Sequence, residues 1–170
     1  SLISTLKNRL PSISFIAEDL GYPSQEVVQL LKDSEFPGMK VLEFAFGANE
    51  DSVYLPHACN KNCVCYTGTH DNDTIKGWLS QLTPSDLKKA EDYLGLNEHE
   101  GYVWGTIRGG ISSVARLFVA QMQDYLELSN EARINTPGTQ EGNWRWRMLS
   151  DQIPHGLSDK IAHITKLYNR

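Results

Sequence analysis

Four short apolar runs separated by helix-like stretches constrain the fold of this 170-residue chain most strongly. The runs are rich in β-branched, aromatic or thiol side chains and occupy residues 13–17, 41–46, 63–66 and 116–122. Short apolar runs that alternate with helices are typical of βαβ units, whose strands pair in parallel. Because such crossovers are right-handed, the helices would cover the outside of the sheet. The pattern therefore predicts an α/β protein with a parallel sheet.

Helix signals fill the intervals between these runs. Ser24 and Thr83 stand where a hydroxyl can accept a hydrogen bond from an amide of the first helical turn. Pro84 suits the first position of a helix, and Gly95 suits its end. Helices are expected over residues 2–9, from Ser24 to the Pro37-Gly38 turn, from Asp73 or Thr74 to Trp78, from Thr83 to about Leu94, and over residues 101–114.

Composition limits the classes of partner. Sixteen basic and twenty-one acidic residues give a net charge of -5, and no segment is dense in Lys or Arg, which argues against nucleic acid or an anionic membrane as a partner. No apolar run approaches the roughly 20 residues of a membrane-spanning helix. The length and 40% apolar content suffice for one sizeable core. The chain begins with Ser rather than Met, as a piece of a longer protein would.

The three cysteines fall within seven residues and admit two interpretations. With His57, the residues Cys59, Cys63 and Cys65 supply enough ligands for a tetrahedral zinc site. However, Cys63 and Cys65 are spaced like side chains on one face of a strand, whereas structural zinc sites usually use pairs separated by two to four residues. We therefore favour free, packed thiols in a reducing compartment and expect no metal.

Two polar clusters follow apolar runs. Residues 66–74 (YTGTHDNDT) follow the run at 63–66, and Glu18 and Asp19 follow the run at 13–17. Chemistry in parallel α/β folds collects at the carboxyl ends of strands, so these clusters are candidate sites. These residues could instead have purely structural roles. Glu18 and Asp19 could interact favourably with the dipole of the next helix, and His70 and Asp71 could form a turn and a helix cap. Physical reasoning alone does not choose between Glu18 and Asp19 as an acid.

Eight short segments occur together in one order: IAEDLG (16–21), PGM (37–39), FAF (44–46), LPH (55–57), YTGTHDNDT (66–74), QD (123–124), NTPGT (135–139) and GNWRWR (142–147). From about residue 12 to about residue 150, the chain thereby resembles the 4-alpha-glucanotransferase family, also called amylomaltase or disproportionating enzyme. Members of this family are (β/α)₈-barrel enzymes that pass α-1,4-glucan segments between malto-oligosaccharides. A complete barrel needs at least ~200 residues.

The resemblance implies the carboxyl-terminal half of a TIM barrel, strands five to eight, with a carboxyl-terminal extension. One partial catalytic domain would fill residues 1–170, with the half barrel at about 12–125 and the extension at about 126–170. The resemblance also implies site roles. Glu18 would be the general acid/base and Asp71 the carboxylate that stabilises the transition state. The substrate contacts would come from His70, Asp19, His57 and Asn135.

The chemistry requires these residue types. Retaining glycosyl transfer needs one carboxyl group that protonates the leaving oxygen and then activates the acceptor, and a carboxylate nucleophile roughly 5 Å away. A third carboxylate can bind sugar hydroxyls more tightly as the ring approaches an oxocarbenium ion. We expect Trp144 and Trp146 to be core aromatics rather than sugar platforms.

The chain departs from the family at the nucleophile. In the family, an Asp in an Arg-x-Asp context lies upstream of the acid/base segment, and no such segment precedes Glu18. The loop after His57 also differs, because Ala58 and Cys59 stand where the family usually has Asn and an aromatic residue. Three hypotheses follow: a fragment of a transglycosidase, a catalytically silent carbohydrate-binding or structural half-barrel, and another retaining α-glucan hydrolase.

The expected partner is a malto-oligosaccharide or other α-glucan, with no organic cofactor. We predict a cytoplasmic location. A half-barrel would expose unpaired strand edges and an apolar face, so we predict that the isolated chain self-associates, most simply as a two-fold dimer.

Overall fold

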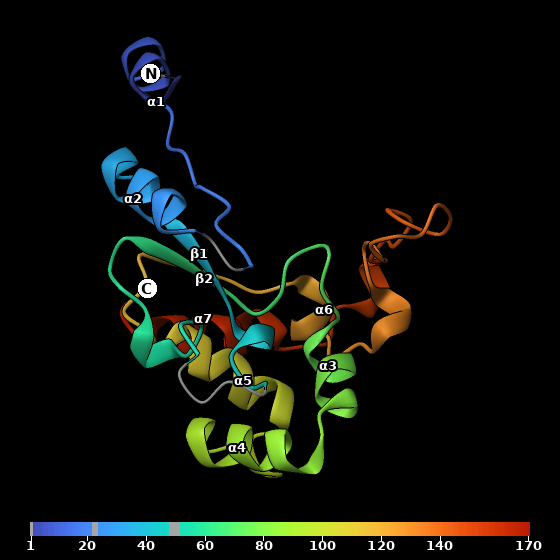
Figure 1. Cartoon of the computed structure of the whole chain (residues 1–170). Coiled ribbons are helices and arrows are strands. Elements are labelled where there is room, and N and C mark those ends of the chain that lie inside the picture. The colour runs from blue at the N-terminus through green and yellow to red at the C-terminus, as the bar shows by residue number, and fades with distance from the viewer. Residues whose placement is uncertain (1, 22–23, 48–51) are drawn as a thin grey trace.

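A parallel sheet forms the centre of the computed structural model, which describes residues 2–21, 24–47 and 52–170 (Figure 1). The strands are β1 (Gly38–Val41), β2 (Cys63–Tyr66) and β3 (Leu117–Val119), in the order β1-β2-β3. Gly38 is paired with Cys63 and Val64 with Leu117, and both pairings are parallel. The carboxyl ends of all three strands therefore meet at one edge, as the sequence predicted.

Helices precede β1, separate β2 from β3 and follow β3 along the chain. They are α1 (Leu2–Arg9), α2 (Gln25–Ser34), α3 (Ile75–Gln81), α4 (Pro84–Leu94), α5 (Tyr102–Ile111), α6 (Met122–Tyr125) and α7 (Leu157–Leu167), with 3₁₀ turns η1 (Leu42–Phe44), η2 (Pro56–Ala58), η3 (Asn130–Ala132) and η4 (Ser150–Gln152). Figure 1 shows α1 and α2 at one end of the molecule and α4 and α5 at the other. The main core lies among α3, α4, α5 and the segment after β1, and includes Phe46, Ile75, Trp104 and Ile107.

Local capping explains where several helices begin and end. The Thr83 hydroxyl accepts a hydrogen bond from Asp86 N, and the Thr74 hydroxyl accepts one from Gly77 N, both at 3.1 Å. Gly95 ends α4 in the left-handed conformation with φ 65°. The predicted cap at Thr83 and the stop at Gly95 are thus confirmed. Of the two starts left open for α3, Asp73 or Thr74, the structure has Thr74 as the cap. The predicted cap bond of Ser24 is wrong in detail, because its hydroxyl instead donates to Glu26 Oε2 at 2.6 Å.

The glycines of α5 permit close packing. A Cβ at Gly109 would lie 2.4 Å from Leu94 Cδ2, and one at Gly110 would lie 2.4 Å from Phe118 Cε2. Helix α5 packs tightly against α4 and β3 at these points, which compensates for the lower helix propensity of glycine.

The strand predictions were partly wrong. Strand β2 has its predicted bounds and β3 is a shorter form of the predicted run 116–122, but the run at 41–46 is not a strand. β1 ends at Val41, and the chain then turns through η1 into the core. A mostly apolar run does not distinguish a strand from a turn that packs into the core, because both bury most of its side chains.

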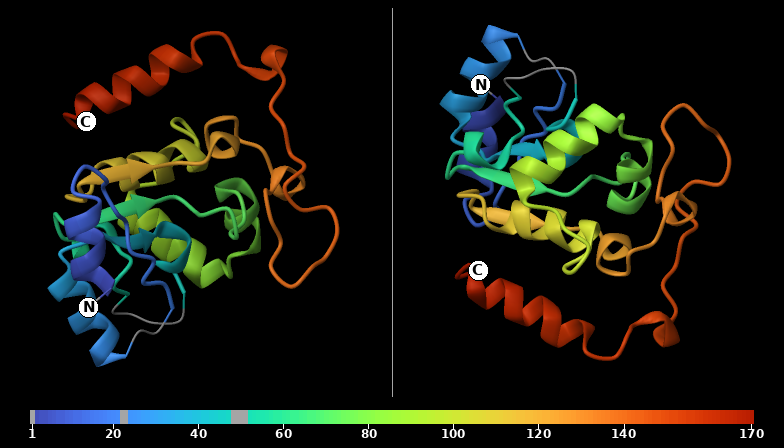
Figure 2. Two further views of the ribbon diagram at one scale, coloured as in Figure 1. Left: turned by 90° about the horizontal axis from the view of Figure 1, so that it is seen from above. Right: turned by 90° about the horizontal axis from the view of Figure 1, so that it is seen from below.

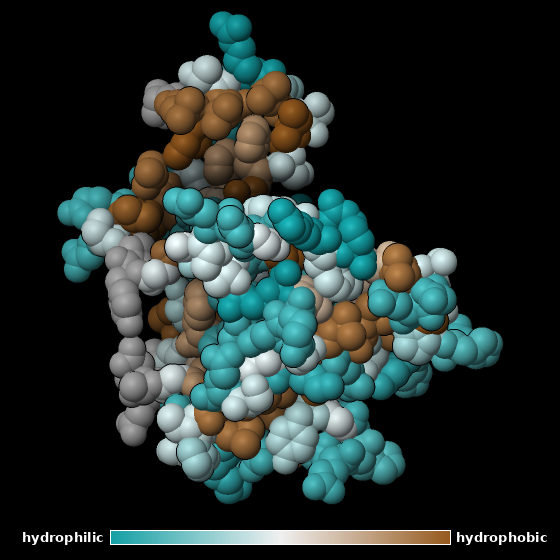
Figure 3. All heavy atoms as spheres, turned by 90° about the vertical axis from the view of Figure 1, so that its right-hand side faces the viewer, coloured by the Kyte–Doolittle hydropathy of each residue, from teal (hydrophilic) through white to brown (hydrophobic). Residues whose placement is uncertain are grey.

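Residues 13–17 form an extended segment rather than the expected strand. Ala17 N donates to Pro37 O at 2.9 Å, which holds the segment beside the start of β1 without a continuous ladder. Ile13 and Ile16 are about half exposed. Leu10, Ile13 and Ile16 line one surface cleft. Figure 3 shows apolar side chains gathered at the end of the molecule that carries α1 and α2.

The carboxyl-terminal helix packs on the main core, in which Leu157 is buried and against which Ile161 packs. Figure 2 shows the segment after α6 projecting from the molecule before the chain returns as α7. Lys160 on α7 lies 3.7 Å from the centre of the Trp104 ring, a cation–π contact that ties α7 to α5. In the described part of the chain, no helix has the length and apolar character needed to cross a bilayer.

Candidate active site

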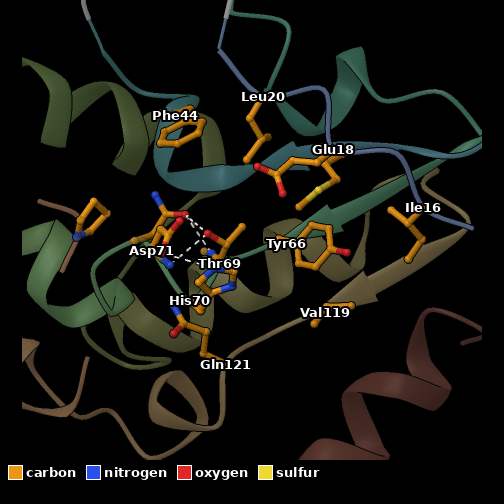
Figure 4. Close-up of a pocket in the computed structure, with 14 residues that line it drawn as sticks. Ile16, Glu18, Leu20, Phe44, Tyr66, Thr69, His70, Asp71, Val119 and Gln121 are labelled. Atoms are coloured by element: carbon orange, nitrogen blue, oxygen red, sulfur yellow. Dashed lines mark hydrogen bonds and ion pairs between the residues drawn. The ribbon is translucent and has the colours of Figure 1, made fainter. Parts of the chain in front are cut away.

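A cleft of about 670 Å³ opens at the carboxyl ends of the strands. Its walls come from the extended segment before α2, from η1, from the loop after β2 and from the segment after β3 (Figure 4). The strand residues Tyr66 and Val119 contribute to it, together with Phe44 and Gln121. Residues distant in the sequence therefore converge on one cleft because the sheet is parallel.

Glu18 and Asp71 both line this cleft. Glu18 reaches it because residues 13–20 are extended: Ile16, Glu18 and Leu20 alternate onto the cleft side, as period-two geometry requires. Figure 4 shows the Glu18 carboxylate pointing into the cleft from one wall and Asp71 lying on the loop that forms another. Two carboxyl groups from separate elements thus face a common space.

The loop after β2 holds His70 and Asp71 at the surface of the cleft. Asn72 Oδ1 accepts hydrogen bonds from Thr69 N at 2.9 Å and from Thr69 Oγ1 at 2.8 Å, and Thr74 caps α3. The turn and the cap are therefore made by Thr69, Asn72 and Thr74. His70 and Asp71 are left with about half of each side chain exposed to the cleft.

Asn135 lies against the same loop. Its Nδ2 donates to Asp71 Oδ1 at 2.6 Å, and its backbone N donates to His70 O at 3.1 Å. His70 Nε2 lies 3.3 Å from the same Asp71 oxygen. The structure therefore brings His70, Asp71 and Asn135 together, with Glu18 across the cleft.

Asp19 and His57 lie elsewhere. Asp19 alternates to the side opposite Glu18, where its Oδ1 accepts a hydrogen bond from Met39 N at 2.6 Å. The Nδ1 atom of His57 lies 2.8 Å from the Tyr93 hydroxyl oxygen, in a separate cleft that Arg108 also lines. Neither residue is among those that line the cleft between Glu18 and Asp71.

Trp144 is not a core residue, so that expectation is wrong. It is 56% exposed, its ring centre lies 5.1 Å from that of His70, and its backbone has φ 63°. A bulky residue in the left-handed region is uncommon, and such conformations cluster near functional sites. Trp146 is only partly buried.

Asp124 supports the loop from beneath, a role that the sequence did not reveal. This fully buried carboxylate accepts hydrogen bonds from Thr67 Oγ1 at 2.6 Å and from Ile75 N at 2.8 Å. Burial raises the pKa of Asp124, although both hydrogen bonds oppose that shift. Because Thr67 and Ile75 bracket the loop, Asp124 fixes both of its ends.

Glu43 is a second buried acid that sequence reasoning missed. The signal was a single Glu within the apolar run at 41–46. Its Oε1 is buried without a hydrogen-bond partner among the described residues, next to Gly68. Burial, together with the nearby carboxylates of Asp124 and Asp73, raises the pKa of Glu43 to about 9. Glu43 is therefore uncharged at neutral pH.

The three cysteines are buried free thiols, packed with Leu42 and Ala115. Within residues 2–21, 24–47 and 52–170, no group of three or more His, Cys, Asp or Glu side chains is arranged to hold a metal ion.

Comparison with known proteins identifies related chains. Residues 1–152 match the family described as 4-alpha-glucanotransferase. The chain is 48% identical over 170 residues to a 4-alpha-glucanotransferase of Clostridium butyricum, covering 99% of this chain and 35% of that protein. It is 46% identical over 172 residues to a chloroplastic/amyloplastic 4-alpha-glucanotransferase of Solanum tuberosum, covering 99% and 30%.

Solved structures give a similar result. The amylomaltase from Streptococcus agalactiae in complex with acarbose has a TM-score of 0.94 and 35% sequence identity, and the match covers 99% of this chain and 34% of that one. The amylomaltase from Corynebacterium glutamicum has a TM-score of 0.65 at 17% identity, which supports the fold alone. The chain spans about a third of the length of the curated relatives it matches.

Proposed function

The chain belongs to the 4-alpha-glucanotransferase family, and we propose that it supplies the acid/base half of a site that transfers α-1,4-glucan segments between malto-oligosaccharides. The observation that carries this proposal is the convergence of Glu18, His70 and Asp71 on one cleft. The silent half-barrel and the hydrolase alternatives lack a comparable observation in their favour.

We assign the general acid/base role to Glu18. Its carboxyl proton passes to the leaving glycosidic oxygen while a carboxylate nucleophile attacks the anomeric carbon and the bond to that oxygen breaks. The Glu18 carboxylate then takes the proton of the acceptor 4-hydroxyl as the acceptor oxygen displaces the nucleophile. We place the nucleophile outside these 170 residues, because no Arg-x-Asp segment precedes Glu18.

Asp71 is assigned to transition-state stabilisation. One of its oxygens is already held by Asn135 and His70, so the carboxylate is oriented before substrate arrives. Its remaining lone pairs can accept hydrogen bonds from sugar hydroxyls, which strengthen as the ring flattens. His70 and Asn135 lie beside it as further sugar ligands, whereas Asp19 is assigned to the support of β1 through Met39 N.

We propose that the chain forms strands five to eight of the family's barrel. The extended segment 13–20 would take the fifth position, and β1, β2 and β3 would follow in order. The half barrel would cover about residues 12–125 and the extension about residues 126–170. The parallel order β1-β2-β3 and the match to a third of an amylomaltase chain support this assignment.

The experiment uses the complete enzyme that contains this chain, with maltotriose as both donor and acceptor. Glu18→Gln and Asp71→Asn should each lower kcat by about 10²–10⁴-fold, because each removes a group that acts on the reacting ring. Glu98→Gln and Asp151→Asn change exposed acids outside the cleft and should leave glucose release unchanged. Full activity of Glu18→Gln would refute the assignment.

The isolated 170-residue chain should not convert maltotriose, because the covalent step needs a nucleophile that we place elsewhere. Glucose release by this chain above that of its own Glu18→Gln variant would show that the mechanism is wrong. We keep the cytoplasm as the predicted location, on the basis of three free thiols.

A further inference from the structure

We propose that Arg133 is a positioning residue that joins the loop carrying His70 and Asp71 to the segment carrying Asn135. This inference rests on the proposed function, since it concerns the geometry of the Asp71 carboxylate. Arg133 is not one of the cleft-lining residues and would act entirely through its neighbours.

All three nitrogens of the Arg133 guanidinium group have hydrogen-bond or ion-pair partners. Nη1 forms an ion pair with Asp73, Nη2 donates to Asp71 O at 2.9 Å, and Nε donates to Asn135 O at 3.3 Å. The Arg133 and Asp73 side chains are only 21% and 16% exposed. A planar fork with fixed donors suits this arrangement, whereas a lysine ammonium is a single point charge that cannot reproduce it.

The bond from Arg133 Nη2 holds the backbone carbonyl of Asp71, while Asn135 Nδ2 and His70 Nε2 hold its carboxylate. The loop and the segment are also joined by the hydrogen bond from Asn135 N to His70 O, in addition to the one from Asn135 Nδ2 to Asp71 Oδ1. Loss of Arg133 would remove three bonds to this junction and leave the Asp73 carboxylate without its cation. Because catalytic groups tolerate little displacement, a shift of about 1 Å in Asp71 can cost about 10²-fold in rate.

The chain offers a matched control. Arg108 has a similarly buried ion pair, with Glu100, at 29% and 27% exposure, and it also donates to a backbone carbonyl, that of Leu94, at 2.8 Å. Its partners lie in and next to α4 and α5, away from the loop after β2. Arg108→Ala therefore removes a comparable set of bonds without touching the junction.

The first measurement is amide hydrogen exchange by NMR in the 170-residue chain. Arg133→Lys and Arg133→Ala should accelerate exchange of the Asn135 amide by about tenfold or more, because its acceptor His70 O is no longer held in place. Arg108→Ala should leave this exchange rate as in the unchanged chain. Wild-type exchange at Asn135 in folded Arg133→Lys would overturn the proposal, and this result does not depend on any activity.

The second measurement is turnover of maltotriose by the complete enzyme. Arg133→Lys should lower kcat by about 10–100-fold with KM changed less than about threefold, because the residue orients a transition-state group rather than binding substrate. Arg108→Ala should retain kcat. Wild-type kcat in Arg133→Lys, alongside an inactive Glu18→Gln enzyme, would overturn the role of Arg133 while leaving the proposed function intact. An active Glu18→Gln enzyme would instead refute the proposed function.

Discussion

Replacing Glu43 by Gln should stabilise the protein at neutral pH. In the folded chain, burial and the nearby carboxylates of Asp124 and Asp73 together raise the pKa of Glu43 from an ordinary value of 4.5 to about 9. Glu43 therefore keeps its proton in the folded state between these two pH values, whereas the unfolded chain releases it. The folded state binds more protons over this interval, so the free energy of unfolding falls as pH rises.

The size of the stability change follows from the interval between pH 4.5, where Glu43 titrates in the unfolded chain, and pH 7. The folded state must keep the Glu43 proton that the unfolded chain releases. At about 1.4 kcal/mol per pH unit, the free energy of unfolding at pH 7 is therefore about 3 kcal/mol lower than below about pH 4.5. Gln is nearly the same shape and has no proton to lose, so Glu43→Gln should unfold with a free energy about 2–3 kcal/mol higher at pH 7. Below about pH 4.5 the two proteins should be nearly equal.

Urea denaturation followed by tryptophan fluorescence, repeated from about pH 4.5 to 9, measures this difference. Subtracting the curve of the unchanged chain from that of Glu43→Gln isolates Glu43 from all other titrating groups. Glu98→Gln, which changes an exposed acid, should give a flat difference. A flat difference for Glu43→Gln as well would refute the reasoning, because it would mean that Glu43 is charged in the folded protein.

Three further predictions concern the packing around the site and the exposed end of the molecule. Gly68→Ala should destabilise the protein by about 1–3 kcal/mol in urea, because its Cβ would lie 2.5 Å from Glu43 Oε1 and 3.1 Å from Asn72 Cβ; an unchanged midpoint would contradict this close packing. Thr67→Val should cost about 1–3 kcal/mol by thermal or urea unfolding, since it removes the hydroxyl that donates to buried Asp124. Thr67→Ser should recover most of this loss, and equal losses for both variants would exclude the hydrogen bond as the cause. The isolated chain should sediment as a dimer at micromolar concentration because of its open strand edges and exposed apolar residues such as Leu2 and Ile13; a monodisperse monomer would count against this prediction.

Residues that act on their own neighbours could be predicted from the sequence. Thr74 and Thr83 cap the helices that follow them, and Gly95 ends α4, since each acts within one helical turn. Strand β2 was also predicted with its observed bounds, because turn-forming residues and a polar loop enclose a short apolar run. The motifs at 16–21 and 66–74 indicated the family and the two acidic residues that line the cleft.

The residue types alone did not decide whether Glu18 or Asp19 is the acid. The family resemblance favoured Glu18, but the physical basis is the extended backbone, which sends Glu18 into the cleft and Asp19 to Met39 N on the other side. The end of β1 at Val41 and the exposure of Trp144 were likewise decided by packing against distant parts of the chain.

The sequence by itself thus determined the α/β class, the family, the starts of α1 to α5 and the two acidic residues proposed for the site, because these depend on local hydrogen bonding and on motif composition. The ends of α2, α3 and α5 lie about three residues from their expected positions, and α6 and α7 were not predicted. Only the tertiary structure decided what holds that site. Thr67 and Asp124 are 57 residues apart, Asp73 and Arg133 are 60 apart, and Asp71 and Asn135 are 64 apart. Such bonds exist only after the parallel strands have brought separate loops to one edge of the sheet, and no local pattern specifies which donor will meet which acceptor.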